Sequence, residues 1–500
     1  MKNLKGIMIA LTVLFLVPLT VNAQNDLQAK IKEGTVVLDQ DYAIDETTTI
    51  ASGMNVIIDL NNHNITATGS AVDAFSNYGT LTIKGNGVIT AQGAAITNYP
   101  GATATLDNGE YLSTGWYTIK NMGHMTINNL KFGNNLNNGA SLIANGYYGS
   151  ASSDRGQSES NATLDSVQMT INGGTFTNMN NSCNVIKNDD FGNLTINGGT
   201  FTAGSDNVNN GNPVIQNWHK AVVNDGVFNA PNGFAIINGH WNDEFGVGEL
   251  TINGGTFTGR DGVFADNYGA TNGKGVLTIN GGTYNGTVYT EHAYSLVLNG
   301  GIFSDKNVQP TSNDVEVYSV IGSDQVIIAS PEDLKANVES NVIKEADIDS
   351  ETLNLIKSVV KEDQKLGAFF EINLFNAVEG LNVEQIANAT DKIKVTLKLP
   401  ELEKISEGYT RTYYMIRIHD GKADVLDVKV NNDGTISFET DKFSTYALAY
   451  KDTKTADAAK QEVKNPNTID AAAIYITLFG VSAAGALGSY KYINKRKENI

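Results

Sequence analysis

Apolar and polar residues alternate in a short motif that recurs through the first three-fifths of the chain. The sequence Leu-Thr-Ile-Asn-Gly-Gly-Thr-Phe-Thr stands at 194–202 and again, unchanged, at 250–258. Close copies stand at 169–177 and 277–285, and looser ones at 221–229 and 296–304. Leu-x-Ile alternation is typical of a half-buried strand, Asn-Gly-Gly can adopt the positive φ of a turn, and the aromatic residue returns to the apolar side. Each copy therefore predicts a strand, a turn and a short second strand.

Asparagine marks the repeat at two places. The first marker recurs at intervals of about 20 to 30 residues, which is the period of solenoids, at Asn172, Asn197, Asn224, Asn253, Asn280 and Asn299. The second marker is apolar-x-Asn, about halfway between the first, at Asn77, Asn98, Asn121, Asn145, Asn188, Asn217 and Asn238, and less well at Asp266. Stacked asparagines can pass amide hydrogen bonds from coil to coil. We therefore expect two ladders and at least two strands in each coil.

These features predict an all-β solenoid, because a single repeat cannot bury its apolar side and stacked repeats can. The pattern over residues 35–310 resembles the right-handed parallel β-helix of the pectin-lyase-like class. That resemblance implies the right-handed sense of a stack of about ten coils. The expected organisation is a parallel β-helix at 24–310, a cap or connector at 311–330, a small stalk module at 331–450 and a spacer at 451–464.

The sequence pattern changes near residue 331, beyond which the Asn-Gly-Gly motif no longer recurs. Asp349 and Ser350 precede a helical apolar period, which predicts a capped amphipathic helix. Residues 370–375 alternate as a strand does, and 425–430 and 435–440 flank Asn-Asn-Asp-Gly, which predicts a hairpin. Residues 443–450 resemble the last strand of modules that precede wall anchors. The module is thus β-rich, either α+β or a β-sandwich.

The N-terminus has the order of a secretory signal. Lys2 and Lys5 precede an apolar run at 7–21, and Val-Asn-Ala follows at 21–23. Cleavage is expected after Ala23, with an uncleaved membrane anchor as the alternative. We therefore expect an exported protein.

The C-terminus predicts attachment to the cell surface. Residues 471–490 carry no charge, are long enough to form a transmembrane helix, and precede a basic tail. The preceding motif and tail resemble the cell-wall sorting signal of Gram-positive surface proteins, although two positions differ from Leu-Pro-x-Thr-Gly. The resemblance implies that a sortase cleaves after Thr468 and joins it to peptidoglycan. The alternative is a segment that stays in the membrane. The motif residues are Asn465, Pro466, Asn467, Thr468 and Ile469.

Charge narrows the range of partners. The chain has a formal net charge of −19, and residues 24–310 contain only two arginines, Arg155 and Arg260. Nucleic acid is therefore not an expected partner, since neutralising phosphate needs a basic face. The chain has one cysteine, so an intramolecular disulfide framework is excluded.

Aromatic residues follow the second asparagine marker in several coils. Rings stacked at the coil spacing would form a strip on which sugar rings could lie, with asparagine and threonine as hydrogen-bond partners. The alternative is that the rings only fill space at the strand ends. The candidate ligand-binding residues are Tyr78, Tyr99, Tyr147, Trp218, Trp241 and Tyr268.

A second set of residues could carry catalysis. Resemblance to the pectin-lyase-like class implies lyases that use carboxylate-held Ca²⁺ and a basic residue, or hydrolases that use carboxylates as acid and base. Charged residues at comparable points of three coils could converge on one face, although none matches a catalytic motif of the class. No cofactor is expected, and Ca²⁺ stays open. The weak candidates are Lys187, Asp189, Asp190, His219, Asp243 and Glu244.

Both markers jump once by more than one period, and the serine-rich stretch at 149–161 predicts a loop there. Long loops of this kind are often functional.

We expect a surface protein whose solenoid binds a glycan, a host surface or another cell. A tethered polysaccharide lyase or glycoside hydrolase and a structural spacer without a ligand are the alternatives.

Overall fold

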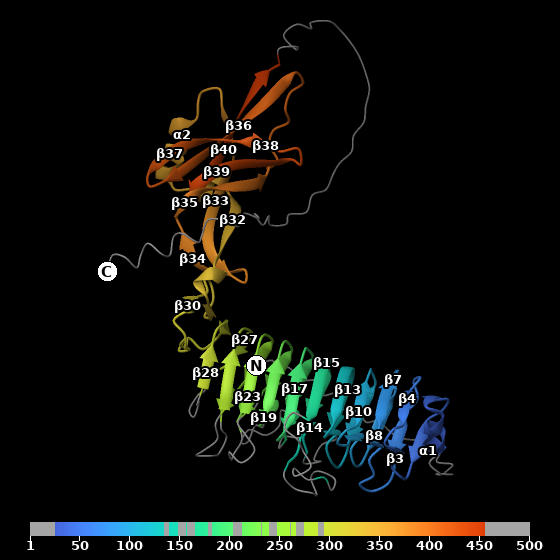
Figure 1. Ribbon diagram of the computed structural model, residues 1–500. Coiled ribbons are helices and arrows are strands. Elements are labelled where there is room, and N and C mark those ends of the chain that lie inside the picture. The colour runs from blue at the N-terminus through green and yellow to red at the C-terminus, as the bar shows by residue number, and fades with distance from the viewer. Residues whose placement is uncertain are drawn as a thin grey trace, which may run out of the picture. The chain divides into compact units, whose positions relative to one another are not determined.

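The computed structural model shows two compact units (Figure 1). The first contains the described residues up to Thr251 and Gly255–Val276, and the second contains Ile252–Gly254, Leu277–Val288 and the residues from Ser295 onward. The repeat region is all-β, as the sequence predicts. The structure describes residues 26–134, 140–148, 157, 166–178, 183–203, 213–231, 233–239, 248–260, 262–266, 275–288 and 295–455.

The first unit is a β-solenoid in which each coil contributes up to three strands. Strands of successive coils pair in parallel and in register, as in β4–β7 and β7–β10. One set of strands leads up to the first asparagine marker of each coil or contains it. These are β1 (Thr35–Val37), β4 (Asn55–Asp59), β7 (Thr80–Lys84), β10 (Thr103–Leu106), β13 (His124–Asn134), β15 (Val167–Asn178), β17 (Gly192–Ile196), β20 (Lys220–Val223) and β23 (Gly248–Ile252). They form the first ladder of the solenoid.

Two further ladders complete the coils. The second holds β2 (Tyr42–Ile44), β5 (Ile65–Ala67), β8 (Val88–Ala91), β11 (Glu110–Ser113), the ends of β13 and β15, β18 (Thr200–Ala203), β21 (Val227–Ala230) and β24 (Thr256–Gly259). The third is a separate sheet of nine strands, one from each coil: β3 (Thr48–Ile50), β6 (Phe75–Asn77), β9 (Ile96–Asn98), β12 (Ile119–Asn121), β14 (Ile143–Asn145), β16 (Ile186–Asn188), β19 (Ile215–Asn217), β22 (Phe234–Asn238) and β25 (Gly262–Asp266).

Alternation along the strands builds the core. The isoleucines of the first ladder, such as Ile127, Ile171 and Ile196, have no exposed surface. The aromatic residues of the motif also point inward and stack at centroid distances of 5.1, 4.5, 5.0 and 4.7 Å through Phe132, Phe176, Phe201, Phe228 and Phe257. Each such pair stabilises the stack by about 0.5–1.5 kcal/mol beyond the area that it buries. The inward position of the motif aromatic is confirmed.

A short helix closes the N-terminal end of the solenoid. Leu27 of α1 (Asp26–Lys30) and Ile31 of η1 (Ile31–Glu33) are fully buried. The Gln28 side chain donates to the Thr49 carbonyl at 3.1 Å and accepts from the Thr49 N–H at 2.6 Å. It therefore occupies the open edge of β3, where unpaired backbone groups would otherwise invite another chain.

The second unit begins with further solenoid strands, and β26 (Gly275–Ile279) crosses the boundary. Strand β27 (Thr283–Asn285) pairs in parallel with β29 (Gly301–Phe303), and β28 (Ser295–Leu298) lies between them in sequence. Next, β31 (Val326–Ala329) pairs antiparallel with both β29 and β30 (Glu316–Ser319). The change from parallel to antiparallel pairing ends the stack of coils.

Residues 331–455, the last part of the chain that the structure describes, form a β-sandwich with the α-helix α2 (Ser350–Val359). The larger sheet has the order β32 (Lys335–Ile343), β33 (Lys365–Val378), β40 (Ser444–Lys454), β36 (Tyr409–His419) and β37 (Lys422–Asp427), and β34 (Leu381–Ile386) also pairs with β33. The smaller sheet has the order β35 (Asn388–Lys398), β39 (Thr435–Lys442) and β38 (Lys429–Val430). Two 3₁₀ turns, η3 (Pro331–Asp333) and η4 (Glu345–Asp347), flank β32.

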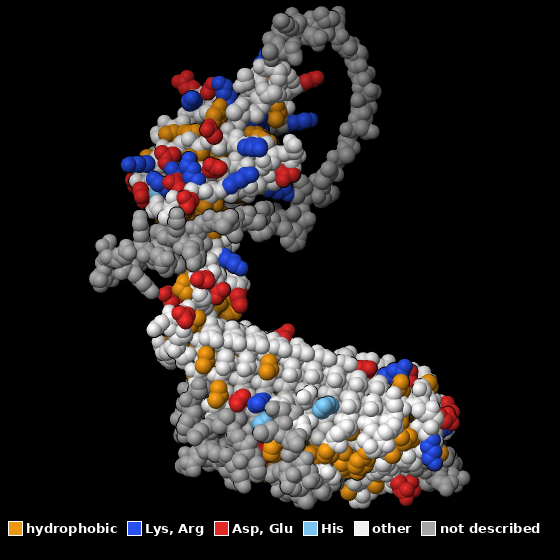
Figure 2. Space-filling model, viewed as in Figure 1, with side chains coloured by type: hydrophobic (Ala, Val, Ile, Leu, Met, Phe, Trp, Pro, Cys, Tyr) orange, Lys and Arg blue, Asp and Glu red, His pale blue; other side chains and the backbone are white. Residues whose placement is uncertain are grey.

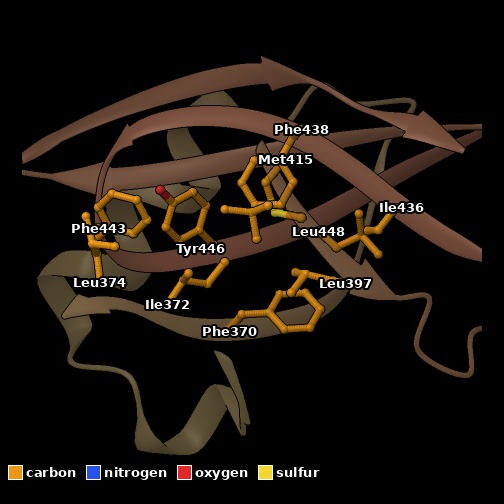
Figure 3. Packing of buried hydrophobic residues seen from close by; sticks show 11 residues of the cluster. Phe370, Ile372, Leu374, Leu397, Met415, Ile436, Phe438, Phe443, Tyr446 and Leu448 are labelled. Atoms are coloured by element: carbon orange, nitrogen blue, oxygen red, sulfur yellow. The ribbon is translucent and has the colours of Figure 1, made fainter. Parts of the chain in front are cut away.

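Two apolar layers hold this module together. Figure 3 shows the layer between the sheets, where Phe370, Met415, Phe438 and Leu448 interdigitate. The second layer lies under α2 (Ser350–Val359), whose Ile356 is fully buried. The predicted helix is confirmed, since the Asp349 side chain accepts from the Thr352 N–H at 2.8 Å. The predicted hairpin is confirmed in a shorter form, as β38 pairs with β39 and β37 pairs with β36.

The predicted terminal segments lie outside the described residues. These are the signal sequence with Ala23, most of the spacer, the sorting motif at 465–469 and the apolar segment at 471–490. Among the helices that the structure describes, none has the length and apolar character needed to cross a membrane.

Candidate functional site

The candidate site lies just after the third ladder, where each coil turns toward the next. From β6 to β22 each strand of this ladder ends in a buried asparagine, and from Asn77 to Asn217 each of these donates its amide to the oxygen of the next at 2.7 or 2.8 Å. The same amides also donate to backbone carbonyls, for example from Asn121 to Gln168 at 3.0 Å. The predicted ladder is confirmed, and it fixes where the following residues of each coil begin.

The aromatic residues after this ladder do not form the continuous exposed strip that the sequence predicts. Tyr78 is 42% exposed, whereas Tyr99, Tyr147 and Trp218 are only 7%, 1% and 6% exposed. Trp241 and Tyr268 lie outside the described residues. The physical reason is that Tyr99 and Tyr147 pack with other apolar side chains of the turns, namely Met122 and Val167, with Phe191 against them.

Tyr78 nevertheless forms an exposed ring with a buried ring behind it. Its ring lies 4.0 Å from that of Tyr99, with 16° between the planes. Burial, and next a hydrogen bond with Tyr78, raise the pKa of Tyr99. The Tyr99 hydroxyl therefore stays protonated behind the exposed Tyr78 ring.

Tyr148 is a second exposed ring, and it is not among the residues that the sequence pattern predicts. It is 44% exposed and stacks on Trp218 at 5.8 Å and 23°. Gly146 has a φ of +108°, and Tyr147 exchanges backbone hydrogen bonds with Asp190 at 2.9 and 3.1 Å. This local turn buries the first tyrosine of the pair. The Tyr-Tyr dipeptide was the available signal, because neighbours in extended backbone point to opposite sides.

A lysine lies against these two rings. The Lys187 Nζ is 3.5 Å from the ring centroid of Tyr148 and 3.9 Å from that of Trp218, which is cation–π geometry. It also lies 3.0 Å from a carboxylate oxygen of Asp189. Burial lowers the pKa of Lys187, and the charge of Asp189 opposes this effect. Lys187 is thus held by both rings and by one carboxylate.

Asp189 joins two lysines that are two coils apart. Lys120 and Lys187 share one register position, with the small Ala144 between them. The Lys120 Nζ is 3.8 Å from Asp189, and neither side chain has exposed surface. Asp189 lies between the two lysine side chains and has no exposed surface, so its carboxylate cannot touch a substrate. Lys187 and Asp189 do converge as the sequence predicts, but in the form of a buried charge cluster.

The other catalytic candidates that the structure describes, Asp190 and His219, add no exposed acid or base. Asp190 is 3% exposed and His219 is 5% exposed, with the His219 ring 6.3 Å from that of Phe191. Asp243 and Glu244 lie outside the described residues, as does the predicted loop at 149–161 apart from residue 157. Within the described ranges, no group of three or more His, Cys, Asp or Glu side chains could hold a metal ion.

A row of hydroxyl, amide and imidazole side chains begins two residues after Tyr78. One position near the start of each of five first-ladder strands, β7 to β17, is in register from coil to coil and is fully or partly exposed. Figure 2 shows few charged side chains on the visible face of the solenoid, in contrast to the crowded charges of the second unit. These five residues of the first ladder, which share this register, are called the polar row: Thr80, Thr103, His124, Gln168 and Asn193.

Comparison with known proteins adds little. No protein-family model matches the chain, and no curated protein matches its sequence. Among solved structures, the chain is similar to the crystal structure of the Acinetobacter phage vB_ApiP_P1 tailspike protein, with 10% sequence identity, 86% of this chain and 84% of that chain covered, and a TM-score of 0.28. A similarity this low supports no argument about function.

Proposed function

We propose that the protein is displayed on the cell surface and that its solenoid binds an uncharged polysaccharide without cleaving it. The observation that carries the proposal is the exposed Tyr78 ring, stacked at 4.0 Å on the buried Tyr99. A buried ring behind an exposed one fixes its orientation, so little side-chain entropy is lost when a sugar stacks on it.

The spacing of the two exposed rings fits an extended ligand. Tyr78 follows Asn77, and Tyr148 lies three residues after Asn145. These asparagines are joined through Asn98 and Asn121. Three steps of one ladder at the spacing of paired strands separate the two positions by about 14 Å along the solenoid axis. An oligosaccharide that lies along the axis can therefore span both rings.

The polar row provides the second kind of contact. It begins at Thr80, two residues after Tyr78, and runs parallel to the axis through Thr103 and His124. Hydroxyl, amide and imidazole groups can donate to and accept from sugar hydroxyls. None of the five residues is acidic, lysine or arginine, and Lys220, which follows Asn193 in the same register, is the first charged residue after them. We therefore infer that the ligand is an uncharged glycan rather than a uronate.

The buried state of Asp189 favours binding over cleavage. Glycoside hydrolysis needs two carboxyl groups that reach the scissile bond. Asp189 has no exposed surface and faces Lys120 and Lys187. A tethered lyase or hydrolase is the alternative that the first experiment separates.

The test uses the mature chain on an array of neutral and acidic glycans, with and without Ca²⁺. We expect binding to neutral polysaccharides, and a loss of roughly tenfold in affinity for Tyr78→Ala and for Tyr148→Ala, since about 1.4 kcal/mol of stacking corresponds to that factor. Tyr409→Ala is the matched control, because Tyr409 is 40% exposed in the second unit. New reducing ends or unsaturated uronates in the same samples would show an enzyme instead.

Surface display needs a separate measurement. We infer that the sorting motif joins Thr468 to peptidoglycan after export. Mass spectrometry of muralytic digests should find a C-terminal peptide that ends at Thr468 and carries a peptidoglycan fragment. Intact chains in the membrane fraction, with residues 469–500 still present, would instead indicate a membrane anchor.

If the glycan array shows neither binding nor products, the solenoid is a spacer and the binding proposal fails.

A further inference from the structure

The chain enters and leaves the sandwich module at opposite ends of one sheet. It enters through β32, whose first residue Lys335 pairs with Ala377 near the C-terminal end of β33. It leaves through β40, whose Tyr450 pairs with Lys365 at the N-terminal end of β33. Strand β33 lies between the two, antiparallel to both (Figure 1).

This arrangement determines how the sheet responds to tension applied along the chain. Tension between the start of β32 and the end of β40 slides both strands along β33 in opposite directions. All the hydrogen bonds of a ladder are then strained together, whereas pulling from one end of a ladder breaks them one after another. Each backbone hydrogen bond is weak alone, so the number that must break at once decides the resistance.

Both ladders are long enough for this effect. In β32–β33 the register runs without interruption from Lys335 to Ile343. In β33–β40 it runs from Lys365 to Ile372, with a single irregularity. Strand β40 is also paired with β36 from Tyr409 to Ile418. The strand through which the chain leaves is therefore hydrogen-bonded on both sides.

Side chains fix the exit strand at the point where tension would reach it. The Arg411 guanidinium donates to both Asp452 oxygens at 2.6 Å and lies 3.9 Å from the Tyr450 ring centroid, with 3% of its side chain exposed. Lys451 pairs with Asp363, just before β33. A bidentate arginine pair of this kind is geometrically specific and strong.

The middle of the exit strand is also buried on both faces. Tyr446 and Leu448 belong to the layer between the sheets, and Ala447 and Ala449 belong to the layer under α2. Sliding β40 would therefore disrupt both apolar layers as well as two ladders. The exit strand passes tension to β33 and then to β32.

We propose that the module at 331–455 is a tension-resisting clamp, loaded in shear between the solenoid and the C-terminal attachment. The source of the load rests on the proposed surface display, while the shear geometry follows from the strand registers alone. The function of the module is thus to keep the solenoid attached when its ligand is pulled.

The test is single-molecule force spectroscopy on the mature chain with paired cysteine handles. The single native cysteine is first removed as Cys183→Ser. Handles at Glu332→Cys and Lys454→Cys, both exposed positions, load the sheet in shear. Handles at Glu362→Cys and Lys454→Cys pull the adjoining ends of β33 and β40 and peel the same ladder.

We expect a rupture force several-fold higher for the first pair of handles than for the second. Equal forces, or a lower force in the first geometry, would overturn the clamp. Urea unfolding of both double-cysteine chains before attachment checks that each is folded to the same stability. If the force difference is found but Thr468 is not joined to peptidoglycan, then the anchoring proposal fails and the clamp remains.

Discussion

The two asparagine ladders of the solenoid have the same geometry in opposite surroundings. On the first ladder the side-chain amide of each asparagine donates to the side-chain oxygen of the preceding one at 2.7–2.8 Å, and these hydrogen bonds are exposed to solvent. The donors are Asn172, Asn197 and Asn224. On the third ladder Asn98 and Asn121 donate to the following asparagine at 2.7–2.8 Å, and these residues have no exposed surface. The difference teaches that a hydrogen bond's contribution depends on what replaces it, which is water at the surface and nothing in the core.

The largest contrast is expected from removing one amide in each ladder. Asn121→Ala leaves the amide of Asn98 and the oxygen of Asn145 buried without that partner, and should lower the free energy of unfolding by roughly 3–5 kcal/mol. Asn197→Ala should cost under about 1 kcal/mol, because water replaces the lost contact. Urea unfolding followed by tryptophan fluorescence measures both, since Trp116 and Trp218 lie in the described part of the solenoid. Equal losses would mean that burial does not separate the ladders.

A smaller contrast is expected at glycines near the two ladders. A Cβ at Gly123 would lie 2.5 Å from the Ala102 carbonyl oxygen and 2.6 Å from that of Tyr99, whereas a Cβ at Gly173 would meet nothing within 4 Å. Gly123→Ala should therefore lower the free energy of unfolding by about 2–3 kcal/mol. Gly173→Ala should change it by at most about 0.5 kcal/mol. The same urea titration applies, and a neutral Gly123→Ala would show that the coils can separate there without cost.

The smallest expected effect concerns the pH dependence of stability. Because burial lowers the pKa of Lys187, the folded state holds fewer protons than the unfolded chain between that pKa and about 10.4, the pKa of an unperturbed lysine. The free energy of unfolding from this group should rise with pH across that window, since the unfolded state binds more protons there. Lys187→Met should remove this rise, as measured by urea titrations from neutral pH upward.

Lys131→Met is the control for that experiment, because Lys131 is exposed on the first unit. It should leave the pH dependence as in the parent chain. An unchanged slope in Lys187→Met would contradict the assignment of the buried lysine, whatever happens to stability at neutral pH.

Much of the fold could be predicted because the repeat is local. Two residues in register, such as Ile171 and Ile196, reveal the coil by their spacing alone, and the inward Phe176 and Phe201 follow from alternation. The Asp349 cap of α2 was also visible, since a cap needs only neighbouring residues. The N-terminal cap was not predicted, because Gln28 meets Thr49 only after the first coil has closed.

The candidate site was harder to predict, because exposure after a turn is not periodic. Tyr78 and Tyr99 hold the same position after an asparagine, yet only Tyr78 is exposed. The spacing of Lys187 and Asp189 predicts catalytic candidates that converge on one face. Their burial against Lys120 depends on the small side chain of Ala144 in the coil between.

By itself, the sequence determined the coil period, the inward-facing stripe and both asparagine markers, since each depends on spacing along one chain. Only the tertiary structure decided which ladder is buried, which tyrosine ring faces solvent, and which ends of β32 and β40 lie apart. These depend on what neighbouring coils and strands place over a residue. Burial is a property of that packing, and no single repeat contains it.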